Sequence, residues 1–160
     1  MRNLLCLLCF LIGTAFAVST HAEDIPKEQK LALAYLDAYN HSDFSKLNRF
    51  YNRETVFNDR TAKRKYTGRY KIVNFLQRAR AGVLETKVQV EHMFNQGSLV
   101  VIIGSHYYRG PGEQFGKPGK MIELAIPGVT TLSVDTGSQQ IKEHVDLLDY
   151  ETMKDQLVTQ

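Results

Sequence analysis

Residues 121–150 read MIELAIPGVTTLSVDTGSQQIKEHVDLLDY, in which two β-rich runs flank a turn sequence, DTGS at 135–138. Asp and Gly accept the backbone angles of a tight reversal, so the two runs predict a pair of antiparallel strands. Alternation along the second strand places His144 and Asp146 on one face and Ile141 on the other. A buried carboxylate beside an imidazole is costly unless it is paired or used, so this pair is the first candidate for chemistry.

The rest of the chain places its main helices before most of the strands. Apolar residues recur at helical spacing in a segment that ends near Asn40, in one that Asp43 caps and in one that begins near Gly68. Further strands are expected at residues 55–58, 87–94 and 99–108, a loop at 109–119 and a last helical turn within 151–157. In the second of these strands, alternation puts four residues on one face: Val88, Val90, His92 and Phe94. This order predicts an α+β fold, with one curved antiparallel sheet wrapped around the N-terminal helices.

The N-terminus has the pattern of a secretory signal peptide. Arg2 provides a positive charge, residues 4–18 are nearly all apolar, and two small-x-Ala sites end at Ala17 and Ala22. We expect cleavage after Ala22, because a polar segment then begins the mature chain; cleavage after Ala17 is the alternative. An uncleaved membrane anchor is a further alternative, although the apolar run is shorter than the ~20 residues of a spanning helix.

This assignment predicts residues 1–22 as the signal peptide, residues 23–160 as a single domain, and a periplasmic or secreted protein. Both cysteines, Cys6 and Cys9, lie in the signal, so the mature chain has no thiol for a disulfide, a nucleophile or a metal site. No later segment is apolar enough to span a membrane, and we expect no stable membrane insertion.

Charge says little about partners. The formal net charge is +3, which is too small to indicate a nucleic-acid partner, and we expect none. Residues 60–71 contain six Lys or Arg among twelve residues. They form either a solvated loop and helix start, or a grip for an anionic partner such as lipid headgroups, envelope polymers or an acidic protein.

Four motifs carry a resemblance: YLDAYNHSD (35–43), VFND (56–59), YTGRYKIVNFL (66–76) and HVDLLDY (144–150). With the order of helices and strands, they resemble the nuclear transport factor 2-like superfamily in its SnoaL-like branch, over residues 27–157. The resemblance implies a cone, with a bent sheet around helices, a ligand pocket at the open end and a homodimer formed through the outer face of the sheet. Members include ketosteroid isomerases, polyketide cyclases, limonene epoxide hydrolases and transport adaptors, so the fold does not settle the function.

Two enzymatic branches can be compared residue by residue. Tyr35 and Asp59 match the isomerase motifs, but the position of the third isomerase group, a carboxylic acid, falls near Thr130 and Thr131, which leaves that oxyanion hole incomplete.

The epoxide hydrolase branch is matched by Asn58 and Asp146. Its central-strand Arg and Asp correspond to Gly104 and His106, so its activity is not carried over. This second comparison implies that Asp146 and His106 both face the pocket.

The candidate catalytic residues are Asp146, His106 and Asp59. A carboxylate that orients His106 or His144 gives a general base near neutral pH, whereas the alternative is a structural carboxylate at the pocket floor. Candidate ligand-binding residues are Asn58, Tyr35, His144, Tyr108 and Phe115. Only one of the neighbours Asn58 and Asp59 can point inward on a regular strand, and Phe115 lies on the glycine-rich loop, which is either a lid or a plain connection.

We expect no metal and no cofactor. Two histidines and Asp146 have the chemistry of an open metal site, but no metal-binding spacing supports one. Three functions remain: a module that binds a small, mostly apolar molecule; an acid–base enzyme of isomerase, cyclase or hydrolase type; and a dimeric adaptor. Several polar groups around an open cavity favour the enzyme, one or two favour binding, and a filled cavity favours the adaptor.

Overall fold

The computed structural model describes residues 24–160, in an α+β arrangement that confirms the predicted fold class. The predicted signal peptide and its cleavage site lie outside the described residues. The elements are α1 (Lys27–Asn40), α2 (Phe44–Phe50), β1 (Val56–Asp59), β2 (Arg64–Thr67), α3 (Arg69–Ala79), β3 (Glu85–Gln96), β4 (Leu99–Pro111), the 3-10 helix η1 (Glu113–Phe115), β5 (Met121–Asp135), β6 (Gln140–Leu148) and α4 (Tyr150–Val158). No helix within residues 24–160 has the length and apolar character to cross a membrane.

The strands form one sheet in the order β2-β1-β6-β5-β4-β3. All neighbours pair antiparallel except β1 and β6, which run parallel because the intervening chain crosses the sheet and returns in the same direction. The predicted antiparallel sheet is therefore corrected at this junction. The basic segment 60–71 also differs from the expected loop and helix start, because it contains β2, which pairs with β1 as a hairpin.

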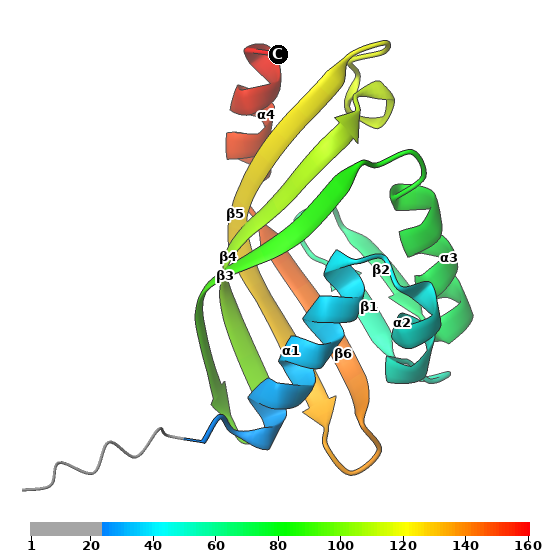
Figure 1. Ribbon diagram of the computed structural model, residues 1–160, viewed down its shortest axis with the longest axis vertical. Helices are drawn as coiled ribbons and strands as arrows, with labels where there is room; N and C mark the ends of the chain where they lie inside the picture. The colour runs from blue at the N-terminus through cyan, green and yellow to red at the C-terminus, as the bar shows by residue number, and fades with distance from the viewer. Residues whose placement is uncertain (1–23) are drawn as a thin grey trace, which may run out of the picture.

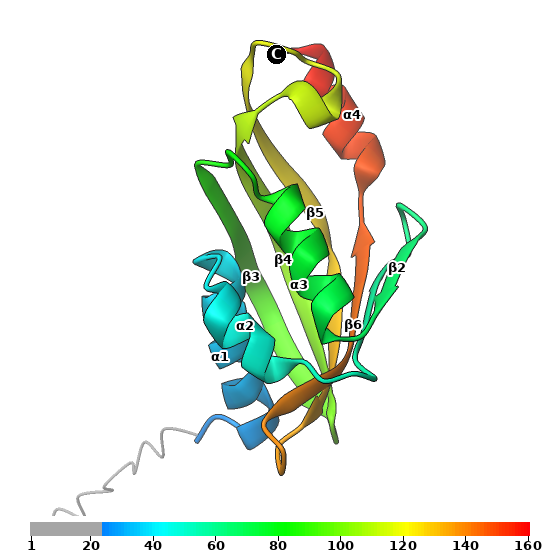
Figure 2. The same ribbon diagram turned by 90° about the vertical axis from the view of Figure 1, so that its right-hand side faces the viewer.

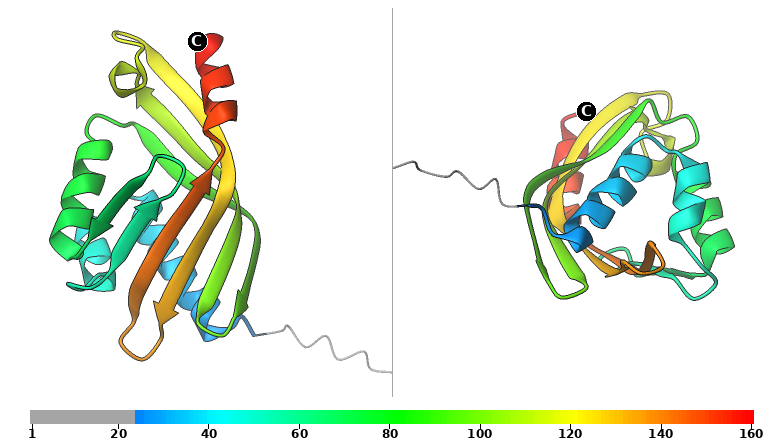
Figure 3. Two further views of the ribbon diagram at one scale, coloured as in Figure 1. Left: turned by 180° about the vertical axis from the view of Figure 1, so that it is seen from behind. Right: turned by 60° about the horizontal axis from the view of Figure 1, so that its bottom comes forward.

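The sheet curves around α1, and α2 and α3 close the open side of the curve (Figure 1, Figure 2). The view from below in Figure 3 shows β3 to β6 wrapping around α1. Because β2 and β3 are free edges, the sheet does not close on itself, and the structure is the open cone that the resemblance implies. The concave face therefore holds both the core and the space next to it.

A bulge bends β3 where it faces β4. The pairing shifts between Val90 and His92, opposite Gly104. A Cβ atom at Gly104 would overlap a backbone carbonyl of β3, so the two strands approach this closely only with glycine at that position. The extra residue also reverses the predicted alternation: Met93 packs against the core, and Phe94 points outward with 51% of its surface exposed.

A second shift in pairing lies between Ser133 and Val134, where β5 meets β6. It turns Ile141 into the core, on the same side as His144, although strict alternation had placed the two on opposite faces. The prediction for His144 and Asp146 is confirmed, since both are buried on the concave face of β6.

The buried apolar residues form two clusters. The larger one joins α1, α2 and α3 to the lower part of the sheet, with Tyr35, Leu47, Ile72, Leu76, Ile102 and Leu132 among its members. The smaller one joins Ile122, Leu124 and Ile126 of β5 to residues of α4 and to Phe115. The chain thus packs two apolar cores and leaves the region between them available for a cavity.

Helix α4 covers the part of β5 that β6 does not reach (Figure 1). The side-chain amide of Gln156 accepts from the N–H of Ala125 at 2.9 Å and donates to its carbonyl at 2.7 Å. The amide of Gln160 does the same for Glu123, at 2.8 and 2.6 Å. These two glutamines therefore satisfy backbone groups that a neighbouring strand would otherwise pair.

Candidate functional site

A cavity of about 340 Å³ lies between the two apolar clusters. Its wall is mainly apolar, from α3, β1, the upper sheet and α4, and includes Phe57, Phe75, Leu76, Ile126, Leu148 and Met153. Polar side chains also reach it, namely Asp59, Arg80, His106, Asp146 and Tyr150. An apolar cavity with a few converging polar groups is the usual form of a small-molecule site.

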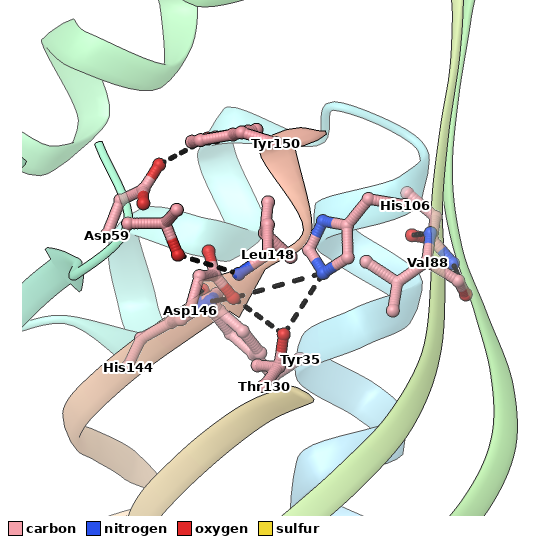
Figure 4. A network of polar contacts seen from close by, with 11 residues as sticks. Tyr35, Asp59, Val88, His106, Thr130, His144, Asp146, Leu148 and Tyr150 are labelled. Atoms are coloured by element: carbon pink, nitrogen blue, oxygen red, sulfur yellow. Dashed lines mark hydrogen bonds and ion pairs between the residues drawn. The ribbon is translucent and has the colours of Figure 1, made fainter. Parts of the chain in front are cut away.

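Asp146 is the centre of the polar network (Figure 4). Its Oδ1 accepts hydrogen bonds from Thr130 Oγ1 at 2.6 Å and from His144 Nε2 at 2.9 Å, and His106 Nε2 lies 3.9 Å away. Its Oδ2 has no hydrogen-bond partner within residues 24–160 and is not sealed from the cavity that Asp146 lines. The carboxylate is therefore anchored on one oxygen and open on the other.

The charge on this carboxylate is maintained by its neighbours. Burial alone would raise the pKa of Asp146, but His144, His106 and the Thr130 hydroxyl outweigh burial and hold that pKa at about 2. Asp146 is therefore ionised at neutral pH, and it acts only as an acceptor toward the groups around it.

Behind Asp146, a buried chain of hydrogen bonds runs into α1. The Nδ1 atom of His144 lies 2.6 Å from the Tyr35 hydroxyl, which lies 2.6 Å from the hydroxyl of Tyr51. Since ionised Asp146 only accepts, His144 carries its proton on Nε2; Tyr35 then donates to Nδ1, and Tyr51 donates to Tyr35. In this arrangement every donor of the chain has an acceptor.

Tyr35 and His144 are consequently core residues, 0% and 1% exposed, and they do not line the cavity. Their predicted contact with a ligand is corrected to a supporting position behind Asp146. Burial raises the pKa of Tyr35 well above its usual value, so its hydroxyl keeps its proton. His144 has both ring nitrogens engaged and is not available as the cavity base.

His106 faces the cavity from β4. Because Thr130 gives its proton to Asp146, the Thr130 oxygen accepts from His106 Nε2 at 3.1 Å, and the lone pair of the ring is left on Nδ1. Burial lowers the pKa of His106, and the attraction of Asp146 only partly offsets it, so the imidazole is neutral at pH 7. Its Nδ1 has no partner within the described residues and lies on the side of the ring away from Thr130 (Figure 4).

On another wall, Asp59 and Tyr150 form a second polar pair. Asp59 Oδ2 accepts from the Tyr150 hydroxyl at 2.5 Å, and its Oδ1 accepts from the N–H of Ala62 at 2.8 Å. Burial, followed by the Asp59 carboxylate, raises the pKa of Tyr150, which keeps the hydroxyl a donor. Of the neighbours Asn58 and Asp59, Asp59 lines the cavity, whereas Asn58 does not.

The cavity is bordered at one end by Tyr108 and Phe115. Their rings pack edge to face with centroids 4.9 Å apart, and Tyr108 donates to the carbonyl of Pro111 at 2.8 Å. Both residues line the cavity, as a ligand contact requires. The expected loop at 109–119 is shorter than predicted, because β4 continues to Pro111 and η1 follows.

Sequence reasoning missed three residues of the cavity network. Tyr150 stands out in the sequence only as the end of a family motif, and no pattern in the sequence distinguishes Arg80. For Thr130, the sequence indicates only that a family carboxyl group is missing at this position. In the structure it lies in register with Asp146 on the neighbouring strand. Within the described chain, no group of three His, Cys, Asp or Glu residues is arranged to hold a metal ion.

The fold and cavity define a class of protein. A structure with a ketosteroid isomerase-like fold from Catenulispora acidiphila DSM 44928, in complex with trimethylamine, is 19% identical, covers 79% of this chain and 91% of its own, and superposes with a TM-score of 0.64. An epoxide hydrolase from M. tuberculosis similar to limonene epoxide hydrolase is 16% identical over 82% of this chain and 92% of its own, with a TM-score of 0.63. The protein therefore has the nuclear transport factor 2-like cone that its sequence resembles.

The family can be stated more narrowly. The model of the SnoaL-like polyketide cyclases matches residues 29–157. A structure from Shewanella putrefaciens CN-32 that is assigned to these cyclases is 55% identical, covers 86% of this chain and 100% of its own, and has a TM-score of 0.84. The chain belongs to the SnoaL-like polyketide cyclase family. None of the curated proteins matches it.

The buried carboxylate predicts a stability effect of pH. Since the folded-state pKa of Asp146 is about 2, against a usual value of 3.8, its stabilisation is complete above about pH 4 and is lost as the pH falls toward 2. Asp146→Asn should lower the free energy of unfolding, and this loss should be about 2 kcal/mol larger at pH 5 than at pH 2. Urea unfolding at a series of pH values measures this, and Glu91→Gln, which removes an exposed carboxylate, should follow wild type. A pH-independent difference would contradict the assignment.

Proposed function

We propose that the protein binds a small, mostly apolar molecule in the cavity and transfers a proton on it, with His106 as the base. The observation that carries this proposal is the neutral His106 imidazole, which is fixed through Nε2 and open to the cavity at Nδ1. A base of this kind suits abstraction of a proton from a carbon next to a carbonyl group, the first step of isomerase and cyclase reactions.

Each part of the network would have a distinct task in such a reaction. His106 would receive the proton on Nδ1, and Asp146, 3.9 Å from Nε2, would stabilise the imidazolium that forms. Thr130 would hold the ring in place through Nε2. Asp59 and Tyr150 would act on the other side of the ligand, both as acceptors, because the only hydroxyl proton of Tyr150 is donated to Asp59.

The open cavity with several converging polar groups supports an acid–base enzyme over an adaptor with a filled cavity. If the test below shows that His106 is dispensable, the result supports a module that only binds its ligand. The ligand is expected to be mostly apolar, because aromatic and aliphatic side chains make up most of the wall.

A general test uses 5-nitrobenzisoxazole, whose isoxazole ring opens when a base removes the C–H proton of that ring and the N–O bond breaks. Wild type should accelerate this reaction, with a rate that rises through a pKa below the usual value of histidine and is level at neutral pH. His106→Gln should lower the rate by about 100-fold or more, and the control His41→Gln, at the exposed end of α1, should not. An unchanged rate and pH profile in His106→Gln would contradict the role of His106 as a base, and ligand binding would be the only function left.

We also propose that the protein is exported and acts in the periplasm or outside the cell after cleavage behind Ala22. The support is the apolar segment with its small-x-Ala sites, which precedes the first described residue. N-terminal sequencing of the protein recovered from outside the cytoplasm should begin at Glu23. A start at Val18 would indicate the alternative site, and an intact N-terminus would contradict cleavage.

Finally, we propose a homodimer through the outer face of the sheet. Ile103, Val129 and Leu147 are in register across β4, β5 and β6. They alternate with Ile102, Thr130 and Asp146, which are buried on the concave face, so they form an apolar row on the outer face of the sheet. Ile103 and Leu147 are 37% and 46% exposed, and Leu99 and Phe94 extend the patch. Such a patch is typical of an interface.

The double variant Ile103→Lys/Leu147→Lys places two charges in this row and should convert the dimer to a monomer, as measured by sedimentation equilibrium. The control Leu33→Lys changes a comparably exposed leucine on α1 and should leave the dimer intact. A wild-type protein that sediments as a monomer at all concentrations would contradict the proposal.

A further inference from the structure

Arg80 holds an unusual position at the end of α3. Its guanidinium lies 4.0 Å from the centre of the Tyr39 ring, and its Nη1 donates to the Tyr39 carbonyl and, at 3.0 Å, to Ser42 Oγ. The aromatic face and the two acceptors fix the planar group against the end of α1. Arg80 also lines the cavity, so the fixed group belongs to the cavity wall.

The positive charge of Arg80 is not neutralised inside the described protein. No carboxylate within residues 24–160 lies within ion-pair distance of it. Its Nη2 is buried without a hydrogen-bond partner, the one side-chain atom of residues 24–160 in that state. A buried donor without an acceptor is destabilising, so such an atom requires an explanation.

The two acids of the cavity do not provide the missing acceptor. Asp146 is held through Oδ1 by Thr130 and His144, and neither of its oxygens is within ion-pair distance of Arg80. Asp59 is held by Tyr150 and a backbone N–H. The charge of Arg80 is nevertheless felt in the site, where it contributes, after burial and other groups, to lowering the pKa of His106. The same cavity is therefore lined by the Arg80 cation, the His106 base and the two carboxylates, Asp59 and Asp146.

We propose that Arg80 is the docking point for a carboxylate of the ligand. This inference rests on the proposed function of the cavity and narrows it: the ligand is an apolar body that carries one carboxylate. An oxygen of that carboxylate accepts from Nη2 and completes the hydrogen bonding of the guanidinium, a pairing that arginine makes well because its donors are fixed in a plane. The anchored carboxylate then fixes the orientation of the apolar part toward His106.

The test compares 2-naphthoate with 2-naphthamide, which have nearly the same shape and differ in charge. Isothermal titration calorimetry of the mature protein at low salt should give about tenfold or tighter binding of the carboxylate. Arg80→Gln should abolish this preference while leaving the affinity for the amide unchanged. The control Arg78→Gln, on the same helix and exposed, removes the same formal charge and should keep the preference.

Other results have defined meanings. Equal binding of the two compounds by wild type, or an equal loss of both in Arg80→Gln, overturns the role of Arg80 and leaves the acid–base function standing. Absence of binding by either compound at millimolar concentration overturns the ligand cavity and this inference together. If Arg80→Gln does not fold, Arg80→Lys keeps the charge without the planar donors and should reduce the preference; an undiminished preference overturns the proposal.

Discussion

A buried carboxylate stays ionised only when hydrogen-bond donors surround it, and this requirement at Asp146 organises the molecule. Thr130 comes from β5, His144 from β6 and His106 from β4, while Tyr35 of α1 holds His144 from behind. The same contacts that make the charge tolerable join the helices to the sheet. Stability and the candidate site therefore depend on one network.

The shape of the sheet explains why the network borders an open space. The bulge in β3, opposite Gly104 of β4, bends the long strands, and the upper half of the sheet packs its own small cluster against α4. The larger cluster fills the lower half with α1, α2 and α3. Between the two, aromatic and aliphatic side chains line the cavity without filling it, and His106 and Asp146 lie where it meets the network.

The sequence predicted well those features that follow from local pattern. Alternation placed His144 beside Asp146, and the resemblance brought in His106. The prediction from alternation failed where strand pairing shifts by one residue, as at Ile141, because a bulge leaves no sign in the alternation itself. The sequence does not identify Arg80 and Tyr150 as site residues, because each is an ordinary residue at a helix end. Only the folded chain brings them to the cavity. The position of Tyr35 behind His144 likewise depends on tertiary packing.

Gln156 of α4 and Gln160, which lies two residues beyond the end of the helix, both bind the upper part of β5. Their side-chain amides make four hydrogen bonds to the backbone of Ala125 and Glu123, and Met153 and Leu157 pack against the apolar cluster of β5. This segment is therefore held to β5 by side chains and not by a backbone ladder. Removing this segment would break those four bonds and expose the Met153 and Tyr150 side of the cavity, whereas the pairing of β3 to β6 does not depend on it. It would also expose backbone groups of β5 to which another strand can add, so this segment protects that part of the strand from edge-to-edge pairing.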